Sequence, residues 1–154
     1  MTKAATSSEL IAMIEQAWAE TPCPPHGSVT ISPDKYEDRA EFEQILRGRH
    51  WREVPYYNLF EWRGDLAALT PEGFRFFLPA WLLVALVDVE IRGSLLDLFE
   101  VAARNGDMGE RLSCFSSAER EALRTFFEYM AASPDQKVAP DPDEWRMLAR
   151  TVPT

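Results

Sequence analysis

Cys23 and His26 form the pattern in this chain that most resembles part of a metal site, because two residues separate them. A sulfur and an imidazole nitrogen at this spacing can bind one Zn²⁺ ion, which usually takes four ligands. The only other cysteine and histidine, Cys114 and His50, do not form a second pair at ligand spacing. We therefore expect no metal site and no cofactor.

The same cysteine and histidine could also act as a nucleophile and its base. Acyl transfer requires an oriented base, a third group that orients it, and donors for the oxyanion. Segment 21–36 contains four prolines and one glycine, and this composition is typical of an irregular loop. We expect no catalytic residue here, and no role is assigned to Cys23 or His26.

Carboxylates are frequent, and Glu37, Asp38 and Glu41 are separated by helical steps. General acid–base catalysis needs two carboxyl groups in different, partly buried environments so that their pKa values diverge. These side chains alternate with Arg39 and other polar residues, which indicates a solvated helix face. None of the seven glycines lies in a phosphate-binding loop of the common types, so the sequence favours a protein that is not an enzyme.

Arg75 lies at the edge of the longest apolar stretch and is a candidate for a structural or a ligand-binding role. A guanidinium group seldom stays buried without a carboxylate or carbonyl oxygens to bond. We expect Arg75 to pair with an acid such as Asp65 or Glu72, or to bond the end of a helix broken by Pro79. An enzyme or small-ligand site near this predicted break at Leu78 and Pro79 is the alternative function.

An aromatic segment with interleaved arginines precedes this stretch. Tyrosine, tryptophan and arginine are the residue types favoured in the centres of protein interfaces, and the aromatic ones also fill helical cores. Both interpretations stay open for the segment. The candidate partner-binding residues are Trp51, Arg52, Tyr56, Tyr57, Trp62 and Arg63.

The apolar stretch itself has no charged side chain from Phe76 to Val87. A helix that crosses a bilayer needs about 20 apolar residues, so this stretch predicts a buried helix and no membrane contact. Thr70-Pro71-Glu72 is typical of a helix start, and we expect a short helix over about 71–77. Pro79 lacks an amide proton, which predicts a break or a sharp kink near Leu78 and then a central apolar helix over about 79–89.

The remaining periodicity predicts a mainly α protein: one compact bundle of about 6–7 helices around that central helix. Capping boxes at Thr6 and Ser116 mark two of the helix starts. Val29 to Ile31 could form a short strand, and this is left open. The other expected elements are an N-terminal helix over 6–20, a proline-rich loop over 21–36, helices over 38–47, after Pro55, from Ser94 to about 105 and from Ser116, and a terminal helix over 141–150.

The chain carries 25 acidic and 16 basic side chains, a net charge of −9. A nucleic-acid backbone and an anionic membrane surface would both be repelled, whereas a basic protein would be attracted. The start MTKAATSSEL lacks the apolar core of a signal peptide, and two cysteines define no disulfide framework. We therefore expect a cytoplasmic protein.

Three segments, LTPEGFRFFLPAWL (69–82), WREVP (51–55) and FSSAEREALRTFFEYM (115–130), resemble a family of small, uncharacterised bacterial proteins classed as a domain of unknown function. The family motif is L-[ST]-P-E-[GA]-F-R-[FY]-[FY]-L-P-A. The resemblance covers about 50–131 and departs from the family near Glu119 and Arg120. It implies a bacterial, cytoplasmic helical domain and brings no catalytic residue with it.

The leading hypothesis is a non-enzymatic protein-interaction domain, in the form of an immunity-type inhibitor or a small regulatory partner. The acidic charge, the missing catalytic pattern and the aromatic segment support it, and a basic protein is the expected partner. The sequence does not determine the oligomeric state.

Overall fold

The structure, a computed structural model, describes residues 5–25, 29–32, 37–132 and 142–154. These residues form eight α-helices and two short 3₁₀ helices, which confirms the mainly α prediction. The elements are α1 (Ser7–Ala17), α2 (Glu37–Leu46), η1 (Trp51–Glu53), α3 (Tyr56–Glu61), η2 (Leu66–Ala68), α4 (Pro71–Ala85), α5 (Val89–Arg104), α6 (Met108–Arg111), α7 (Ser117–Ala132) and α8 (Pro142–Thr151).

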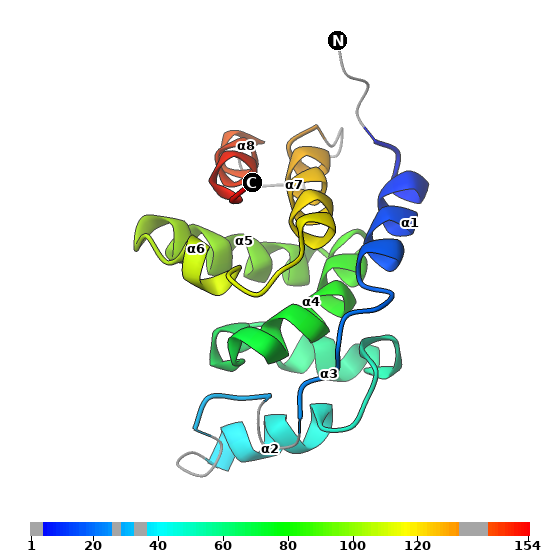
Figure 1. The fold of residues 1–154 in the computed structure, drawn as a ribbon, viewed down its shortest axis with the longest axis vertical. Helices are drawn as coiled ribbons and strands as arrows, with labels where there is room; N and C mark the ends of the chain where they lie inside the picture. The colour runs from blue at the N-terminus through cyan, green and yellow to red at the C-terminus, as the bar shows by residue number, and fades with distance from the viewer. Residues whose placement is uncertain (1–4, 26–28, 33–36, 133–141) are drawn as a thin grey trace.

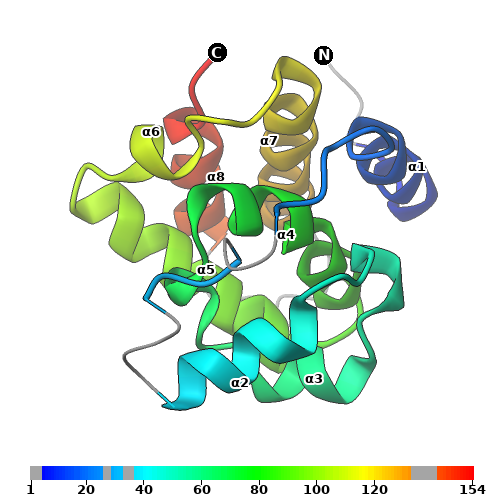
Figure 2. The same cartoon turned by 60° about the horizontal axis from the view of Figure 1, so that its bottom comes forward.

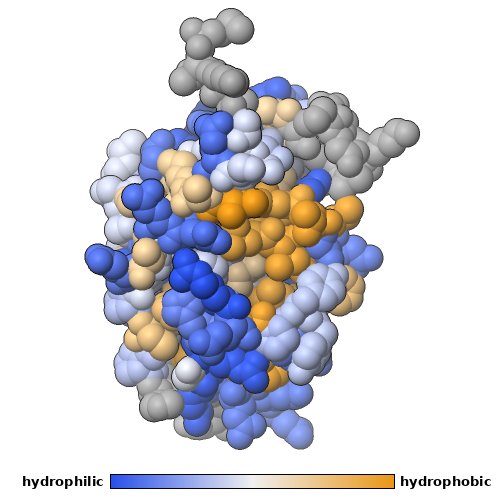
Figure 3. Space-filling view, turned by 90° about the vertical axis from the view of Figure 1, so that its right-hand side faces the viewer, coloured by the Kyte–Doolittle hydropathy of each residue, from blue (hydrophilic) through white to orange (hydrophobic). Residues whose placement is uncertain are grey.

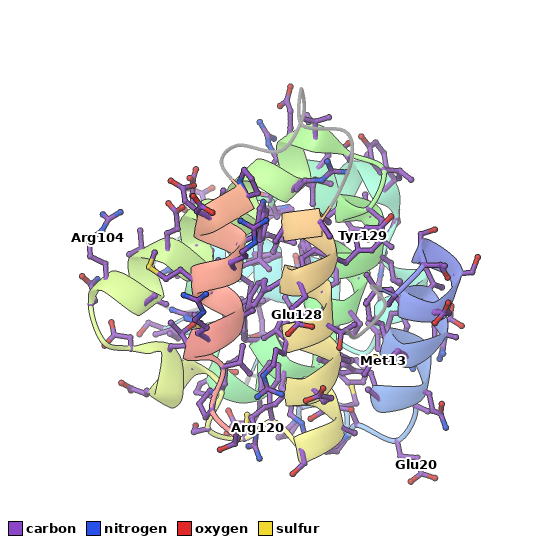
Figure 4. All side chains as sticks on the ribbon, turned by 90° about the horizontal axis from the view of Figure 1, so that it is seen from above. Met13, Glu20, Arg104, Arg120, Glu128 and Tyr129 are labelled. Carbon is purple, nitrogen blue, oxygen red and sulfur yellow. The ribbon has the colours of Figure 1, made fainter. Side chains whose placement is uncertain are left out.

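Helix α4 runs through the middle of the bundle, with α5, α7 and α8 on one side and α2 and α3 on the other (Figures 1 and 2). Helix α7 packs against both α8 and α1, and α5 packs against α4. Figure 4 places Met13 on the side of α1 that faces α7. Ten of the 15 residues of α4 are buried, so the prediction of a central apolar helix is confirmed.

Of the two outcomes predicted near Leu78, the break is wrong, because α4 continues without interruption from Pro71 to Ala85. A proline inside a helix leaves the carbonyl four residues earlier without its amide donor, here the carbonyl of Arg75. The indole Nε1 of Trp18 donates a hydrogen bond to this oxygen at 2.7 Å. Trp18 is fully buried at the C-cap of α1, so its side chain supplies the donor that Pro79 lacks.

The turn between α4 and α5 lies at 86–88, inside the range predicted for the central helix. Asp88 caps α5 by accepting a hydrogen bond from the amide of Ile91 at 3.0 Å. Ser94, the expected cap, lies inside α5. The guanidinium of Arg92 bonds the carbonyls of Ala85 and Leu86 at 3.0 Å, which satisfies the end of α4.

Both predicted helix caps are confirmed, and at Ser116 the capping box is complete. The hydroxyl of Thr6 accepts from the amide of Glu9 at 3.2 Å. The hydroxyl of Ser116 accepts from the amide of Glu119 at 3.1 Å, and the Glu119 carboxylate accepts from the Ser116 amide at 2.6 Å. These contacts start α1 and α7 where the sequence predicts.

The residues around Val29 form one isolated antiparallel bridge, between Thr30 and Leu69, and no longer strand within the described part of the chain. The buried carboxylate of Glu43 accepts hydrogen bonds from the amides of Val29 and Thr30 at 3.1 and 3.0 Å. Gly73 of α4 lies so close to the carbonyl of Val29 that an added Cβ would stand 2.3 Å from its oxygen. This segment is therefore held by α2 and α4.

Candidate functional site

Two of the candidate partner-binding residues belong to the core. Trp51 is 2% exposed and Trp62 is 8% exposed, and Trp62 stacks on Phe42 with 4.6 Å between the ring centroids. These two side chains therefore have almost no surface to offer a partner, and for them the core interpretation holds. Periodicity could not separate the two interpretations, because the segment contains two short helices joined by turns.

Tyr56 and Tyr57 stand on the surface at the start of α3, with 54% and 67% of their area exposed. The hydroxyl of Tyr56 donates a hydrogen bond to Asp88 in the turn between α4 and α5. Val87 and Val89 flank Asp88, and they are 85% and 47% exposed. The bond thus brings the start of α3 beside this turn, and we name the four residues Tyr56, Tyr57, Val87 and Val89 the tyrosine–valine patch.

Acidic groups border the tyrosine–valine patch. Partial burial opposes ionisation of Asp88, but the hydrogen bonds from Tyr56 and from backbone amides outweigh it and lower the pKa of Asp88. The same hydrogen bond raises the pKa of Tyr56, so the pair holds a protonated phenol and a carboxylate at neutral pH. Glu90 lies one residue beyond Val89, with its carboxylate 3.4 Å from the guanidinium of Arg63.

The two arginines of the aromatic segment are engaged with its rings. The guanidinium of Arg63 lies 4.1 Å from the centroid of the Phe60 ring and donates to the Phe60 carbonyl at 2.8 Å. The guanidinium of Arg52 lies 4.4 Å from the centroid of the Trp51 ring. Arg52 is exposed and Arg63 half-buried, so both could still reach a bound partner at the surface.

Arg75 pairs with Glu119 and not with the predicted Asp65 or Glu72. Its Nε donates to the two carboxylate oxygens of Glu119 at 2.7 and 3.2 Å. The Glu119 side chain has no exposed area, and it also accepts hydrogen bonds from the Thr21 hydroxyl and the Ser116 amide. One buried carboxylate therefore joins α4, α7 and the end of the α1 segment.

A pocket of about 450 Å³ opens beside this ion pair, lined by Arg75, Glu119, Thr21 and residues at the end of α1 that include Glu20. Figure 4 shows Glu20 extending away from the bundle. Leu78 and Pro79 are buried and do not line the pocket. Because α4 is unbroken at these residues, the helix break near which the alternative function placed its ligand site is absent. The charge of Arg75 is already balanced by Glu119.

Glu100 on α5 is a titratable group that sequence reasoning missed. Partial burial, and then a hydrogen bond with Glu144 of α8, raise the pKa of Glu100 to about 7. Its Oε1 is buried without a hydrogen-bond partner. No local pattern could reveal this pair, because the two carboxyl groups come from helices far apart in the sequence.

The cysteines and histidines that could bind a metal are Cys23, His26, His50 and Cys114. Cys23 is exposed and Cys114 is half-buried, and both are free thiols. His26 lies outside the described residues. Within the described ranges, no three cysteine, histidine or acidic side chains gather in a way that could hold a metal ion.

Hydrophobic surface is not restricted to the tyrosine–valine patch. Figure 3 shows a hydrophobic area surrounded by hydrophilic residues on the face that lies to the right in Figure 1, where α1 is found. None of the helices in the described ranges combines the length and the apolar composition that crossing a membrane requires.

Comparison with known proteins identifies the family but not an activity. No curated protein and no solved structure matches the chain significantly. The sequence profile of DUF6714, described as a family of unknown function, matches residues 6–148. This range extends beyond the resemblance over 50–131 at both ends, so it takes in α1, α2 and most of α8. Because nearly the whole helical bundle is matched, the chain belongs to DUF6714, a family of unknown function.

Proposed function

We propose that this protein is a non-enzymatic interaction domain that binds a basic protein partner through the tyrosine–valine patch. The single observation that carries the proposal is the hydrogen bond between Tyr56 and Asp88, which joins the segment that carries Tyr57, 67% exposed, to the turn that carries Val87, 85% exposed. Isolated exposed apolar residues are common on protein surfaces, but aromatic and aliphatic side chains grouped at one place mark interaction sites.

The patch has the composition and the rigidity of an interface centre. Full burial of one valine side chain contributes about 1.5 kcal/mol or more, and tyrosine is a frequent hot-spot residue. The hydrogen bond between Tyr56 and Asp88 already holds the start of α3 against the turn. A partner would therefore bind a largely ordered surface, and less conformational entropy would be lost on binding.

The charge around the patch supports a basic partner. The lowered pKa of Asp88 keeps this carboxylate ionised, and the carboxylate of Glu90 is exposed beside its weak pair with Arg63. The whole chain has a net charge of −9, which accelerates the association of a positively charged protein at low salt. An immunity-type inhibitor and a small regulatory partner both fit this description.

The proposal is tested by capture from an extract of the source cell, followed by binding measurements with the purified captured protein. Tyr57→Ala and Val87→Ser should each weaken binding by about tenfold or more, because each removes an exposed side chain from the interface centre. Met147→Ala on α8 is the matched control, because Met147 is 52% exposed and lies outside the patch. Binding should also weaken as salt concentration rises.

Two results would contradict the proposal. One is the absence of any specific partner at physiological salt. The other is a partner that binds the Tyr57→Ala and Val87→Ser variants as tightly as it binds the unchanged protein.

A further inference from the structure

A second pocket of about 450 Å³ lies between α5, the segment that follows α3, and the short helix α6. Leu66, Leu98 and Val101 contribute apolar lining, and Val101 is 49% exposed. Arg63, Asp97 and Arg111 are among the charged residues that line it. Apolar walls with a few converging polar groups, in a volume of about 300–1,000 Å³, are typical of small-molecule sites.

Arg111 is the feature of this pocket that the fold does not explain. Its Nε is buried without a hydrogen-bond partner among the described residues. Burial lowers the pKa of Arg111, although Asp107 and Glu110 act in the opposite direction. The guanidinium lies 5.2 Å from the centroid of the Phe74 ring, a contact that replaces none of its hydrogen bonds.

The other partly buried arginines of the core show what Arg111 lacks. Arg75 pairs with the carboxylate of Glu119 at 2.7 Å, and Arg92 bonds two carbonyl oxygens at the end of α4. A partly desolvated guanidinium with no acceptor is costly, and a carboxylate that binds its planar fork would offset that cost. Arg111 is only half-buried, and a ligand carboxylate in the pocket would supply the acceptor that its guanidinium lacks among the described residues.

We infer that this pocket binds a small organic monocarboxylate, whose carboxylate pairs with Arg111 and whose apolar part packs on Leu66, Leu98 and Val101. The inference is independent of the proposed protein-binding function, because these residues lie outside the tyrosine–valine patch.

The charges that line the pocket disfavour a ligand with more than one negative charge. Arg63 and Arg111 contribute two positive charges, and Asp97 and Asp107 contribute two negative charges. The guanidinium of Arg63 also forms an ion pair with Glu90, whose carboxylate lies 3.4 Å away. A doubly charged phosphate would be repelled by the two aspartates more strongly than a monocarboxylate, so phosphate should bind weakly.

The test uses the full chain and chemical shifts of ¹⁵N-labelled backbone amides, with sodium hexanoate as the probe. Hexanamide, which has the same length without the charge, and inorganic phosphate are the comparison probes. Hexanoate should shift the amides of pocket residues such as Val101 and Arg111, and it should bind about tenfold or more tightly than hexanamide or phosphate. This comparison needs no variant, so it does not depend on a variant that folds.

Arg111→Gln should reduce hexanoate binding about tenfold or more, and Arg104→Gln should change it less than about twofold. Arg104 is the matched control, because it lies at the end of α5 close to the pocket but does not line it, and Figure 4 shows it extending into solvent. Tyr57→Ala should bind hexanoate normally, which separates this site from the protein-binding surface.

Several results would overturn the inference. These are shifts from hexanoate that spare the pocket residues, equal binding of hexanoate and hexanamide, tighter binding of phosphate, or unchanged hexanoate binding by the Arg111→Gln variant.

Discussion

Trp18→Phe should destabilise the protein chiefly because it removes one hydrogen-bond donor. Nε1 of Trp18 donates at 2.7 Å to the carbonyl of Arg75, the oxygen for which Pro79 provides no amide. Phenylalanine cannot donate, so the carbonyl would lose its partner, at a cost of about 1–3 kcal/mol in the free energy of unfolding. The smaller ring also leaves a packing defect, whose cost must be separated from that of the hydrogen bond.

Pro79→Ala provides that separation. Alanine restores the amide at position 79, which can donate to the Arg75 carbonyl within the continuous helix α4. In this background the carbonyl keeps a partner when Trp18 is replaced, so Trp18→Phe should cost only its packing loss. The packing loss occurs in both backgrounds and cancels in a double-mutant cycle, which should leave a coupling free energy of about 1–2 kcal/mol.

The measurement is urea unfolding followed by far-ultraviolet circular dichroism for the unchanged protein, both single variants and the double variant. Trp145→Phe with Pro79→Ala is the control cycle, because the buried Nε1 of Trp145 has no hydrogen-bond partner. That control should be additive within about 0.5 kcal/mol. If the cycle of Trp18 with Pro79 were equally additive, the hydrogen bond would not be what allows a proline inside α4.

Glu119→Gln should lower the free energy of unfolding by about 2–3 kcal/mol in urea, because Arg75 loses its buried carboxylate partner; a change below about 0.5 kcal/mol would contradict this. The pKa of Glu100 rises from 4.5 to about 7 on folding, so the folded state binds more protons between these values. The free energy of unfolding should therefore fall as pH rises through this window, and Glu100→Gln should flatten the fall; an unchanged profile would refute the assignment. Burial raises the pKa of the Cys114 thiol, so iodoacetamide at pH 8 should alkylate the exposed Cys23 faster than Cys114. Peptide mass spectrometry would measure the two rates, and equal rates would contradict this prediction.

Most helix starts were predictable because their signals are local. The helix caps at Thr6 and Ser116 involve residues three positions apart, and both form as the sequence indicates. The apolar faces of α7 and α8 were predictable for the same reason: Phe126 and Trp145 are buried as their helical spacing requires. The misplaced start of α5 shows the limit, because Asp88 and Ser94 are both acceptable caps and packing selected Asp88.

The aromatic segment shows why the candidate site could be predicted only in part. Its composition is compatible with both an interface and a core, and no spacing rule applies across two short helices joined by turns. The tertiary structure distinguishes core residues from surface residues in this segment, because it buries Trp51 and Trp62 and leaves Tyr56 and Tyr57 exposed. The pocket at Arg111 had no sequence signal, because its lining comes from segments distant in the chain.

By itself, the sequence determined the fold class, the central position of the apolar helix and most helix starts, since these depend on residues a few positions apart. The tertiary structure alone decided that α4 is unbroken and that Arg75 pairs with Glu119. Trp18 and Glu119 lie 57 and 44 positions from Arg75, so only the folded chain brings them to its carbonyl and its guanidinium. A buried hydrogen-bonding group must find a partner, and which partner it finds depends on how the helices pack.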